Sequence, residues 1–264
     1  MLYWSFIFQL LIVSLTYGRY GIIASMLAVL LLMLWYKISL KFNLPTDRYS
    51  LIKWEDIPWL YDGIARMANR ARISMPKIYI EDSPIPTAYS FRNAIVLSAG
   101  LFEVLDKDEI LAVAAHEIGH IKNGDTFIFP LSKYAQYIMG ALTIAILAGS
   151  TSQGIKIISA LNFLIYYAGL RKFLRKREFL ADSVALRIAE VPYALKEALE
   201  ELKYYEAALK AKDIPLPTIK PQVERKEEPQ NPIMYIMSTH PSYDERIARI
   251  MAIVDMYRIF EYMS

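Results

Sequence analysis

The sequence predicts a mainly α-helical protein with a small β-sheet, an α+β fold, anchored in a membrane by two hydrophobic helical hairpins. Three observations support this prediction. Hydrophobic residues make up 55% of the 264 residues and the mean hydropathy is +0.24, whereas soluble domains are usually about 45–50% apolar. Two long apolar stretches, 2–36 and 134–170, contribute much of this excess. Most other segments show helical spacing of apolar residues, while 76–98 contains alternation typical of strands.

Net charge and cysteine content exclude several kinds of site. The formal net charge is only +3, which is too small for an extended nucleic-acid footprint, so no nucleic-acid partner is expected. The chain contains no cysteine, which excludes disulfides and thiolate metal ligands. Any metal site must therefore use His, Asp or Glu side chains.

The first apolar stretch predicts two membrane helices joined by a short turn. Between Leu2 and Tyr36 the only charged side chain is Arg19, which lies in the glycine-containing sequence YGRYG. Each limb is somewhat shorter than the about 20 apolar residues that a membrane span requires. One long tilted helix is therefore the alternative interpretation.

The second apolar stretch, 134–170, resembles the first, with GSTSQG at 149–154 as its turn. Two buried core helices of a soluble domain are the alternative, because these limbs are also short. We predict an N-terminal transmembrane hairpin at 1–40. The remainder, 41–264, is predicted to be one domain that the second hydrophobic hairpin interrupts at 127–170.

Basic residues flank the apolar stretches and are scarce at their tips. They are Lys37, Lys41 and Arg48 after the first stretch, Lys133 before the second, and the run RKFLRKR at 171–177 after it. The tips contain only Arg19 and Lys156. By the positive-inside rule, the basic flanks face the cytoplasm. We therefore expect a multi-pass cell-membrane protein with the lipid bilayer as a partner and with 37–133 and 171–264 on the cytoplasmic side.

The region between the apolar stretches predicts a helix, a strand, a hairpin and a second helix. The helix is expected at 55–73, the strand at 76–82, and the hairpin strands at 87–91 and 94–98. Asp106 and Glu109 form a capping box that starts the helix KDEILAVAAHEIGHIKN, and Gly124 ends it. The pentapeptide HEIGH, at 116–120, thus lies in the last turns of this helix.

HEIGH has the spacing of a helical metal site. Residues four apart point the same way, so His116 and His120 can bind one ion, while Glu117 lies about 100° around the helix, within reach of a bound water, as a general base. A catalytic zinc requires a third ligand, for which a carboxylate or His240 is available. Glu178 is the best candidate, and Asp182, one turn later, can accept the N–H of a ligating imidazole.

Each of these residues also has an ordinary interpretation. The two histidines can be surface or core residues of a helix, with Glu117 in solvent. Glu178 can form a helix salt bridge with Arg175 or Arg177. Asp182 can be a surface or capping carboxylate.

The order HEIGHIKNGD, hydrophobic hairpin, REFLADS and STHPSYDERIARI resembles the HtpX-type membrane zinc metalloproteases, relatives of the CAAX prenyl proteases. The resemblance extends over most of the chain. It implies a zincin-like metalloprotease with one zinc ion held by His116, His120 and Glu178, and with Glu117 as the catalytic base. It also implies cleavage of membrane or misfolded proteins in quality control under stress.

Two further residues belong to the motif THPSYDER. The resemblance places His240 near the cleft, where its imidazole can stabilise an oxyanion. Alternatively, Thr239 and His240 cap the helix that starts near Pro241. Arg246 is interpreted as a structural ion-pair partner rather than a catalytic group.

The strand before the HEIGH helix is the predicted substrate-binding element. Thr87, Ala88, Tyr89 and Ser90 are candidates to hydrogen-bond an extended protein or peptide substrate as an added strand. The family commonly has Asn-Ala-Phe-Ala here, whereas this chain reads PTAYS. Its substrate preference is therefore left open, and a simple packed strand is the alternative.

Three other functions compete with this interpretation. A CAAX-type prenyl-protein protease is one, although its relatives have more membrane helices than two hairpins provide. A non-catalytic membrane scaffold that binds metal is another. A transporter is disfavoured because the apolar segments lack intramembrane carboxylates and basic residues.

Overall fold

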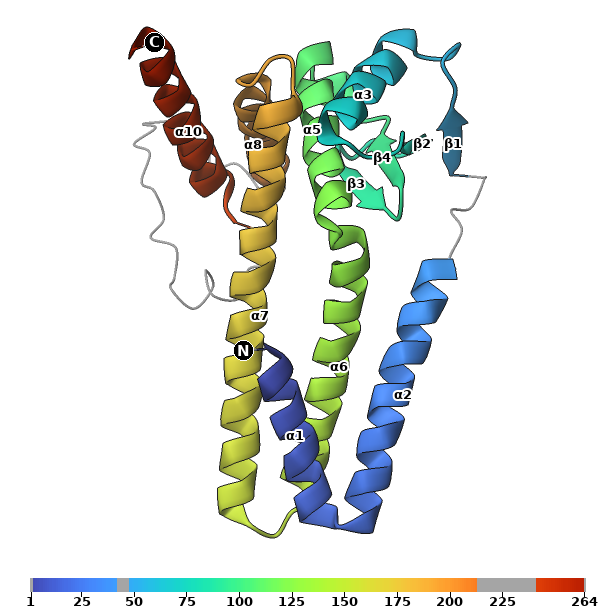
Figure 1. Cartoon of the computed structure of the whole chain (residues 1–264), viewed down its shortest axis with the longest axis vertical. Coiled ribbons are helices and arrows are strands. Elements are labelled where there is room, and N and C mark those ends of the chain that lie inside the picture. Colours follow the sequence, from blue (N-terminus) through green and yellow to red (C-terminus); the bar gives the residue numbers. More distant parts are fainter. Residues whose placement is uncertain (1, 42–47, 213–240, 264) are drawn as a thin grey trace. The chain divides into compact units, whose positions relative to one another are not determined.

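The computed structural model describes residues 2–41, 48–212 and 241–263 (Figure 1). The chain divides into two compact units. Among the described residues, the first unit comprises 2–41 and 124–176, and the second comprises 48–123, 177–212 and 241–263. We call them the membrane unit and the protease unit, after the roles that the sequence predicts for them. The predicted fold class is confirmed, because helices dominate and a single small sheet is present among the described residues.

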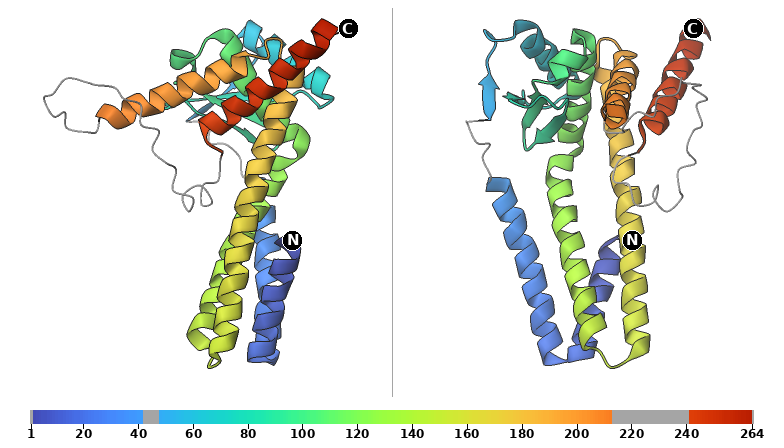
Figure 2. Two further views of the ribbon diagram at one scale, coloured as in Figure 1. Left: turned by 90° about the vertical axis from the view of Figure 1, so that its left-hand side faces the viewer. Right: turned by 180° about the vertical axis from the view of Figure 1, so that it is seen from behind.

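The membrane unit consists of long apolar helices. They are α1 (Leu2–Tyr17), α2 (Arg19–Lys41), α6 (Asp125–Gly149) and the first part of α7 (Gln153–Ile188). These helices run side by side (Figures 1 and 2). The chain breaks between α1 and α2 at Gly18, whose φ of 55° is accessible to glycine at little cost. The first apolar stretch is therefore a helical hairpin, and the alternative of one long helix is wrong.

Three of these helices, α2, α6 and α7, are long and apolar enough to cross a membrane, whereas α1 is shorter. Large apolar side chains on their outer surfaces are exposed, including Met26 (68%), Ile144 (66%) and Leu164 (59%). Such surfaces are stable in lipid and costly in water. The protein is a membrane protein.

A polar network lies inside the membrane unit. The Nε2 of Gln9 donates to the hydroxyl of Thr143 at 3.1 Å and to that of Ser159 at 2.6 Å. The Nδ2 of Asn162 donates to the Oε1 of Gln9 at 2.9 Å and to the carbonyl of Ser5 at 3.0 Å. The Ser5 hydroxyl in turn donates to the Oδ1 of Asn162 at 2.9 Å. This network, all of it buried, joins α1 to α6 and α7.

The protease unit contains the sheet and the remaining helices. In chain order these elements are β1 (Tyr49–Ile52), α3 (Pro58–Ala71), β2 (Lys77–Glu81), β3 (Ala88–Phe91), β4 (Ala94–Ser98), α4 (Leu101–Val104), α5 (Lys107–Asn123), the end of α7, α8 (Ala194–Lys212) and α10 (Tyr243–Met263). The predicted strands and the predicted HEIGH helix are confirmed within a few residues. The strand β1 was not predicted.

The sheet has the strand order β1-β2-β4-β3, so β3 is an edge strand. The β2–β4 pair is parallel and the other two pairs are antiparallel. A two-residue turn joins β3 to β4, with Arg92 at a φ of 54°, which matches the twist of hairpin strands. One face of the sheet, including Ile78, Ile95 and Leu97, packs with α3, α5 and α8 into the main hydrophobic core.

Candidate metal centre

The helix α5 is fixed at its start and buried where HEIGH occurs. The backbone N–H of Glu109 donates to the Oδ1 of Asp106 at 2.9 Å, and the N–H of Asp106 donates to the Glu109 carboxylate at 2.8 Å. These bonds confirm the predicted capping box. His116, Glu117 and His120 are all buried, so the interpretation of Glu117 as a solvated surface residue is wrong.

A glycine allows α7 to approach α5 closely. A Cβ atom at Gly119 would lie 2.7 Å from the carbonyl oxygen of Ala181 and 2.8 Å from its Cα. Both atoms belong to the backbone, so a larger residue would force the helices apart. Arg177 adds a cross-link, because its guanidinium donates to the carbonyl of Asn123 at the end of α5. The side chains of Glu178 and Asp182 thereby reach the HEIGH face.

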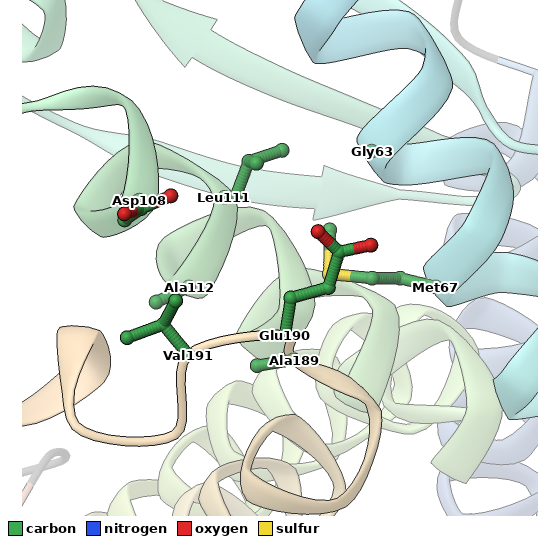
Figure 3. A pocket seen from close by; sticks show the side chains of 8 residues that line it. All are labelled: Gly63, Met67, Asp108, Leu111, Ala112, Ala189, Glu190 and Val191. Atoms are coloured by element: carbon green, nitrogen blue, oxygen red, sulfur yellow. The ribbon is translucent and has the colours of Figure 1, made fainter.

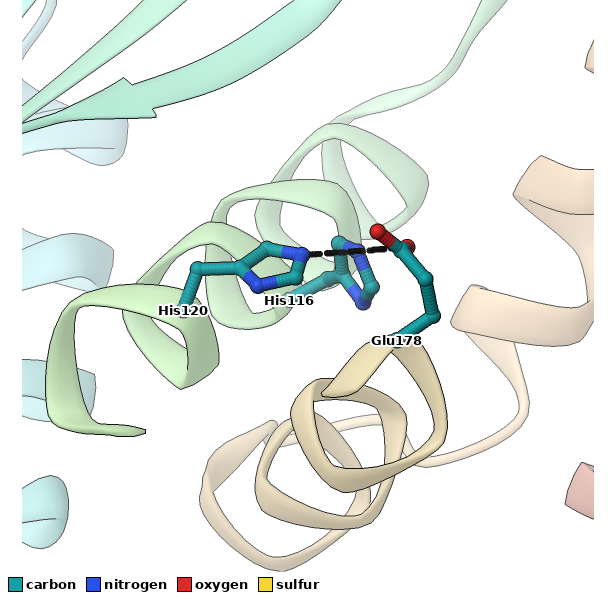
Figure 4. Close-up of side chains that lie close together, drawn as sticks. All are labelled: His116, His120 and Glu178. Carbon is teal, nitrogen blue, oxygen red and sulfur yellow. Dashed lines mark hydrogen bonds and ion pairs between the residues drawn. The ribbon is translucent and has the colours of Figure 1, made fainter. Parts of the chain in front are cut away.

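Three side chains converge between the two helices (Figure 4). The Nε2 atoms of His116 and His120 are 3.1 Å apart. One carboxylate oxygen of Glu178 lies 3.6 Å from the first nitrogen and 3.8 Å from the second. The carboxylate of Glu178 therefore lies beside both imidazoles.

The spacing of these atoms fits a zinc ion. Two ligand atoms about 2.0–2.1 Å from a tetrahedral zinc lie about 3.3–3.4 Å apart. The three observed separations, 3.1, 3.6 and 3.8 Å, lie around this value. Two imidazoles and one carboxylate are also a donor set that catalytic zinc uses. The residues present thus fit the metal that the sequence predicted.

Asp182 and Arg246 form a second layer behind His116. The Nδ1 of His116 lies 2.8 Å from the Oδ1 of Asp182, which leaves Nε2 directed at the site. Arg246 of α10 donates to both carboxylate oxygens of Asp182, at 3.0 and 2.5 Å. The carboxylate accepts from both neighbours, so it can fix the tautomer and orientation of the imidazole.

The pKa values of this layer reflect paired charges rather than burial alone. Burial would raise the pKa of Asp182, but the Arg246 charge and the hydrogen bond from His116 lower it to about 2. Burial and Arg246 act to lower the pKa of His116, yet Asp182 and Glu178 outweigh them and raise it. Burial likewise opposes the charge on Arg246, whose pKa is nevertheless raised, first by Asp182 and then by Glu178 and Glu117.

The other predicted site residues have different outcomes. His240 and Thr239 lie outside the described residues. The alternative that they cap the last helix is wrong, because α10 begins at Tyr243 and the Ser242 hydroxyl accepts from the backbone N–H of Glu245 at 3.1 Å. Ala88 and Ser90 lie on the edge strand β3 and Thr87 immediately precedes it. The N–H of Ser98 donates to the carbonyl of Thr87 at 2.9 Å.

Hydrogen bonding in the hairpin alternates along β3. Because Thr87 bonds to Ser98, and pairs alternate in an antiparallel ladder, Tyr89 also faces β4 with its backbone polar groups. The backbone N–H and C=O of Ala88 and Ser90 consequently point to the free edge. These two residues, rather than Tyr89, carry the donors for an added strand.

A small hollow elsewhere in the protease unit is separate from this centre (Figure 3). It lies between Gly63 and Met67 of α3, Leu111 of α5, and Glu190 and Val191 beyond α7. None of the converging ligands lines it. Glu190 is engaged by Arg66 at 2.6 Å, so this hollow is bordered by a surface ion pair.

No role was predicted for Gly119 from the sequence, and only a structural role was predicted for Arg246. Gly119 is a glycine inside a helix, which costs about 1 kcal/mol relative to alanine and so signals close packing. Arg246 was predicted as a structural ion-pair partner. The structure confirms the ion pair and adds its location directly behind His116, with Nη2 3.2 Å from Nδ1.

Comparison with known proteins identifies the family. Residues 55–254 match the model of peptidase family M48. A protease HtpX homolog of Sulfurihydrogenibium sp. (strain YO3AOP1) is 32% identical, and the alignment covers 88% of this chain and 87% of the relative. Homologs from Persephonella marina (31% identity, 88% of each chain) and Pyrococcus abyssi (29%, covering 89% and 88%) have the same name. The chain therefore belongs to peptidase family M48, as an HtpX-type membrane metalloprotease.

Proposed function

We propose that this protein is a zinc-dependent endopeptidase in which His116, His120 and Glu178 bind the metal. The convergence of these three ligand atoms, all within 4.8 Å of one another, is the observation that carries the proposal. Membership in family M48 supports the same reaction, hydrolysis of peptide bonds.

The chemistry can be divided between the metal and the side chains. Zinc, when bound, lowers the pKa of its water to about 7 and polarises the substrate carbonyl. Glu117 accepts the proton of the attacking water and then transfers it to the leaving amine. Asp182, held by Arg246, keeps His116 oriented. His240 is proposed to stabilise the oxyanion.

The free edge of β3 is the proposed substrate-binding element, comprising Thr87, Ala88, Tyr89 and Ser90. An extended peptide added at this edge would hydrogen-bond to the outward N–H and C=O groups of Ala88 and Ser90. Binding through backbone groups makes sequence selectivity weak. This suits a substrate class defined by exposed extended chain, such as misfolded proteins.

The proposed setting is the cytoplasmic face of the cell membrane. It is supported by the basic residues beside the membrane helices, concentrated in 171–177. We propose that the substrates are misfolded or membrane proteins and that the role is protein quality control under stress.

Metal analysis combined with casein digestion tests the reaction. The purified wild type should contain about one zinc per chain, cleave casein, and lose cleavage when a chelator removes the metal. Glu117→Gln should retain zinc and lose about 10²- to 10⁴-fold in rate. Full activity in this variant would refute the base role. Zinc without cleavage by the wild type would instead favour a metal-binding scaffold.

Matched substitutions at one position test the substrate edge. Ser90→Pro removes the outward N–H, whereas Ser90→Ala keeps it. The proline variant should have a raised KM for casein with zinc content unchanged, and the alanine variant should behave as wild type. Equal KM values in the two variants would contradict strand addition.

A further inference from the structure

The sheet of the protease unit has a second face that faces away from the main core. The register places Leu51, Tyr79, Val96 and Tyr89 in one row across the four strands. Side chains in such a row share a face, and alternation adds Tyr49 and Phe91. We call the surface formed by Tyr49, Leu51, Tyr79, Tyr89 and Phe91 the outer sheet face.

The outer sheet face is apolar but has hydroxyl groups. Leu51 is 48% exposed, the other four residues are partly exposed, and Val96 of the same row is buried. None of the five residues belongs to a hydrophobic cluster of the described chain. The hydroxyl of Tyr89 donates to that of Tyr49 at 3.0 Å, and Tyr49 donates to Glu81 at 3.2 Å.

Within the four strands and the β3–β4 turn, the charged residues of this face are basic or paired. Glu81 forms an ion pair with Arg48 at 3.1 Å, so its charge is compensated. Lys77 occupies the same face by alternation, and Arg92 lies in the β3–β4 turn; both are exposed. Aromatic and aliphatic side chains bordered by Lys and Arg are suited to the headgroup region of a bilayer.

Chain length limits how far β1 can lie from the end of α2. The helix α2, one of the three that can cross the bilayer, ends at Lys41, and β1 begins at Tyr49. The eight Cα–Cα steps between these two residues span at most about 30 Å even when fully extended. The first strand of this face is therefore tethered within that distance of the helix end.

We propose that the outer sheet face rests on the bilayer in which the chain is anchored, with its tyrosines and Phe91 in the lipid headgroup layer and with Lys77 and Arg92 facing lipid phosphates. The occupant is the lipid–water interface rather than a protein. The opposite face keeps its packing against α5, and the edge strand β3 stays open along its free side. The inference does not depend on hydrolysis, because it concerns a surface away from the metal ligands.

Fluorescence quenching by lipid tests this contact in the full-length protein. Because the chain has no cysteine, a single fluorophore can be attached after Leu51→Cys or Lys77→Cys, both at exposed positions of the outer sheet face. Tyr204→Cys on α8, where the side chain is 75% exposed, is the control. Each labelled protein is placed in nanodiscs of phosphatidylcholine and phosphatidylglycerol, with or without a nitroxide on the headgroup.

The nitroxide should reduce emission from the labels at positions 51 and 77 and leave the label at 204 unchanged. Unchanged emission at both sheet positions, or equal loss at all three, would overturn the proposal. Contact between two copies of the chain through this face is tested separately. Leu51→Cys protein labelled with a donor fluorophore is mixed in one vesicle with the same variant labelled with an acceptor. Energy transfer between them, without quenching in single-copy nanodiscs, would assign the face to a protein interface instead and would also overturn the proposal.

Discussion

The membrane unit and the protease unit each bury a cluster of polar side chains, but the two clusters differ in chemistry. The first contains neutral amides and hydroxyls around Gln9 and Asn162. The second contains titratable groups around His116, His120 and Glu178. Both are buried, so each would be costly unless its polar atoms had partners.

The difference lies in how the polar atoms are satisfied. Gln9 and Asn162 each use both amide N–H groups within the network and each accept a bond at the oxygen. Such a network holds helices together and leaves no amide donor for another molecule. The imidazoles and the carboxylate instead direct two ring nitrogens and a carboxylate oxygen at one another, an arrangement that a divalent cation stabilises. Buried polarity thus serves assembly in one unit and chemistry in the other.

The largest expected effect comes from removing a metal ligand. Glu178→Ala leaves two imidazoles, so zinc binding at the site and casein cleavage should both be lost, while the membrane unit stays folded. Zinc content and proteolysis measure this. Glu200→Ala, an exposed carboxylate of α8, is the matched control and should change neither. Retention of zinc and activity by Glu178→Ala would contradict the metal-binding role of the second cluster.

Removing the charge behind His116 should have a smaller effect. Asp182→Asn can still accept from the imidazole but no longer neutralises Arg246. Loss of such outer partners usually costs about 10- to 100-fold in metal affinity or activity. Zinc competition titration gives the affinity. An unchanged affinity would show that the second layer is only structural.

Adding one methyl group between the helices tests the geometry of the metal centre. Gly119→Ala should push α7 away from α5, since its Cβ would overlap the Ala181 backbone. Overpacking of this kind costs about 1–3 kcal/mol. Both thermal stability and zinc affinity should fall. Gly154→Ala, with no close contact except a serine hydroxyl at 3.8 Å, should leave both unchanged.

The smallest effect is expected in the membrane unit. Gln9→Leu removes the central amide, and interhelical hydrogen bonds in membranes contribute about 0.6–2 kcal/mol. Heat resistance in detergent should fall slightly while zinc affinity stays constant. Gln136→Leu is the matched control. It makes the same change at a side chain for which the structure shows no hydrogen bond to a described residue. A change in zinc affinity for Gln9→Leu alone would link the two clusters functionally.

The sequence predicted the elements whose signals are local. The capping pair Asp106 and Glu109 and the hairpin turn at Arg92 determine chain direction within a few residues, so the structure confirmed both. The strand 49–52 was missed because four residues carry little periodicity and its partner lies about 30 positions away. The helix α7 continues through the basic run 171–177, because lysine and arginine are good helix formers.

For the candidate site, spacing and long-range geometry played different parts. The helical period was enough to place His116, His120 and Glu117 together. Glu178 and Asp182 required the family resemblance, since a membrane hairpin separates them from HEIGH in the sequence. The contact of Gly119 with Ala181 and the two bonds from Arg246 to Asp182 depend on how three helices pack, which no single segment encodes.

X-ray absorption spectroscopy of the zinc-loaded protein tests the metal assignment most directly. The three-ligand site predicts nitrogen and oxygen neighbours at about 2.0–2.1 Å, with outer-shell scattering from two imidazole rings. Glu178→Ala should alter this spectrum or abolish zinc binding. Scattering from fewer than two imidazoles, or from three, which would require His240, would contradict coordination by His116, His120 and Glu178.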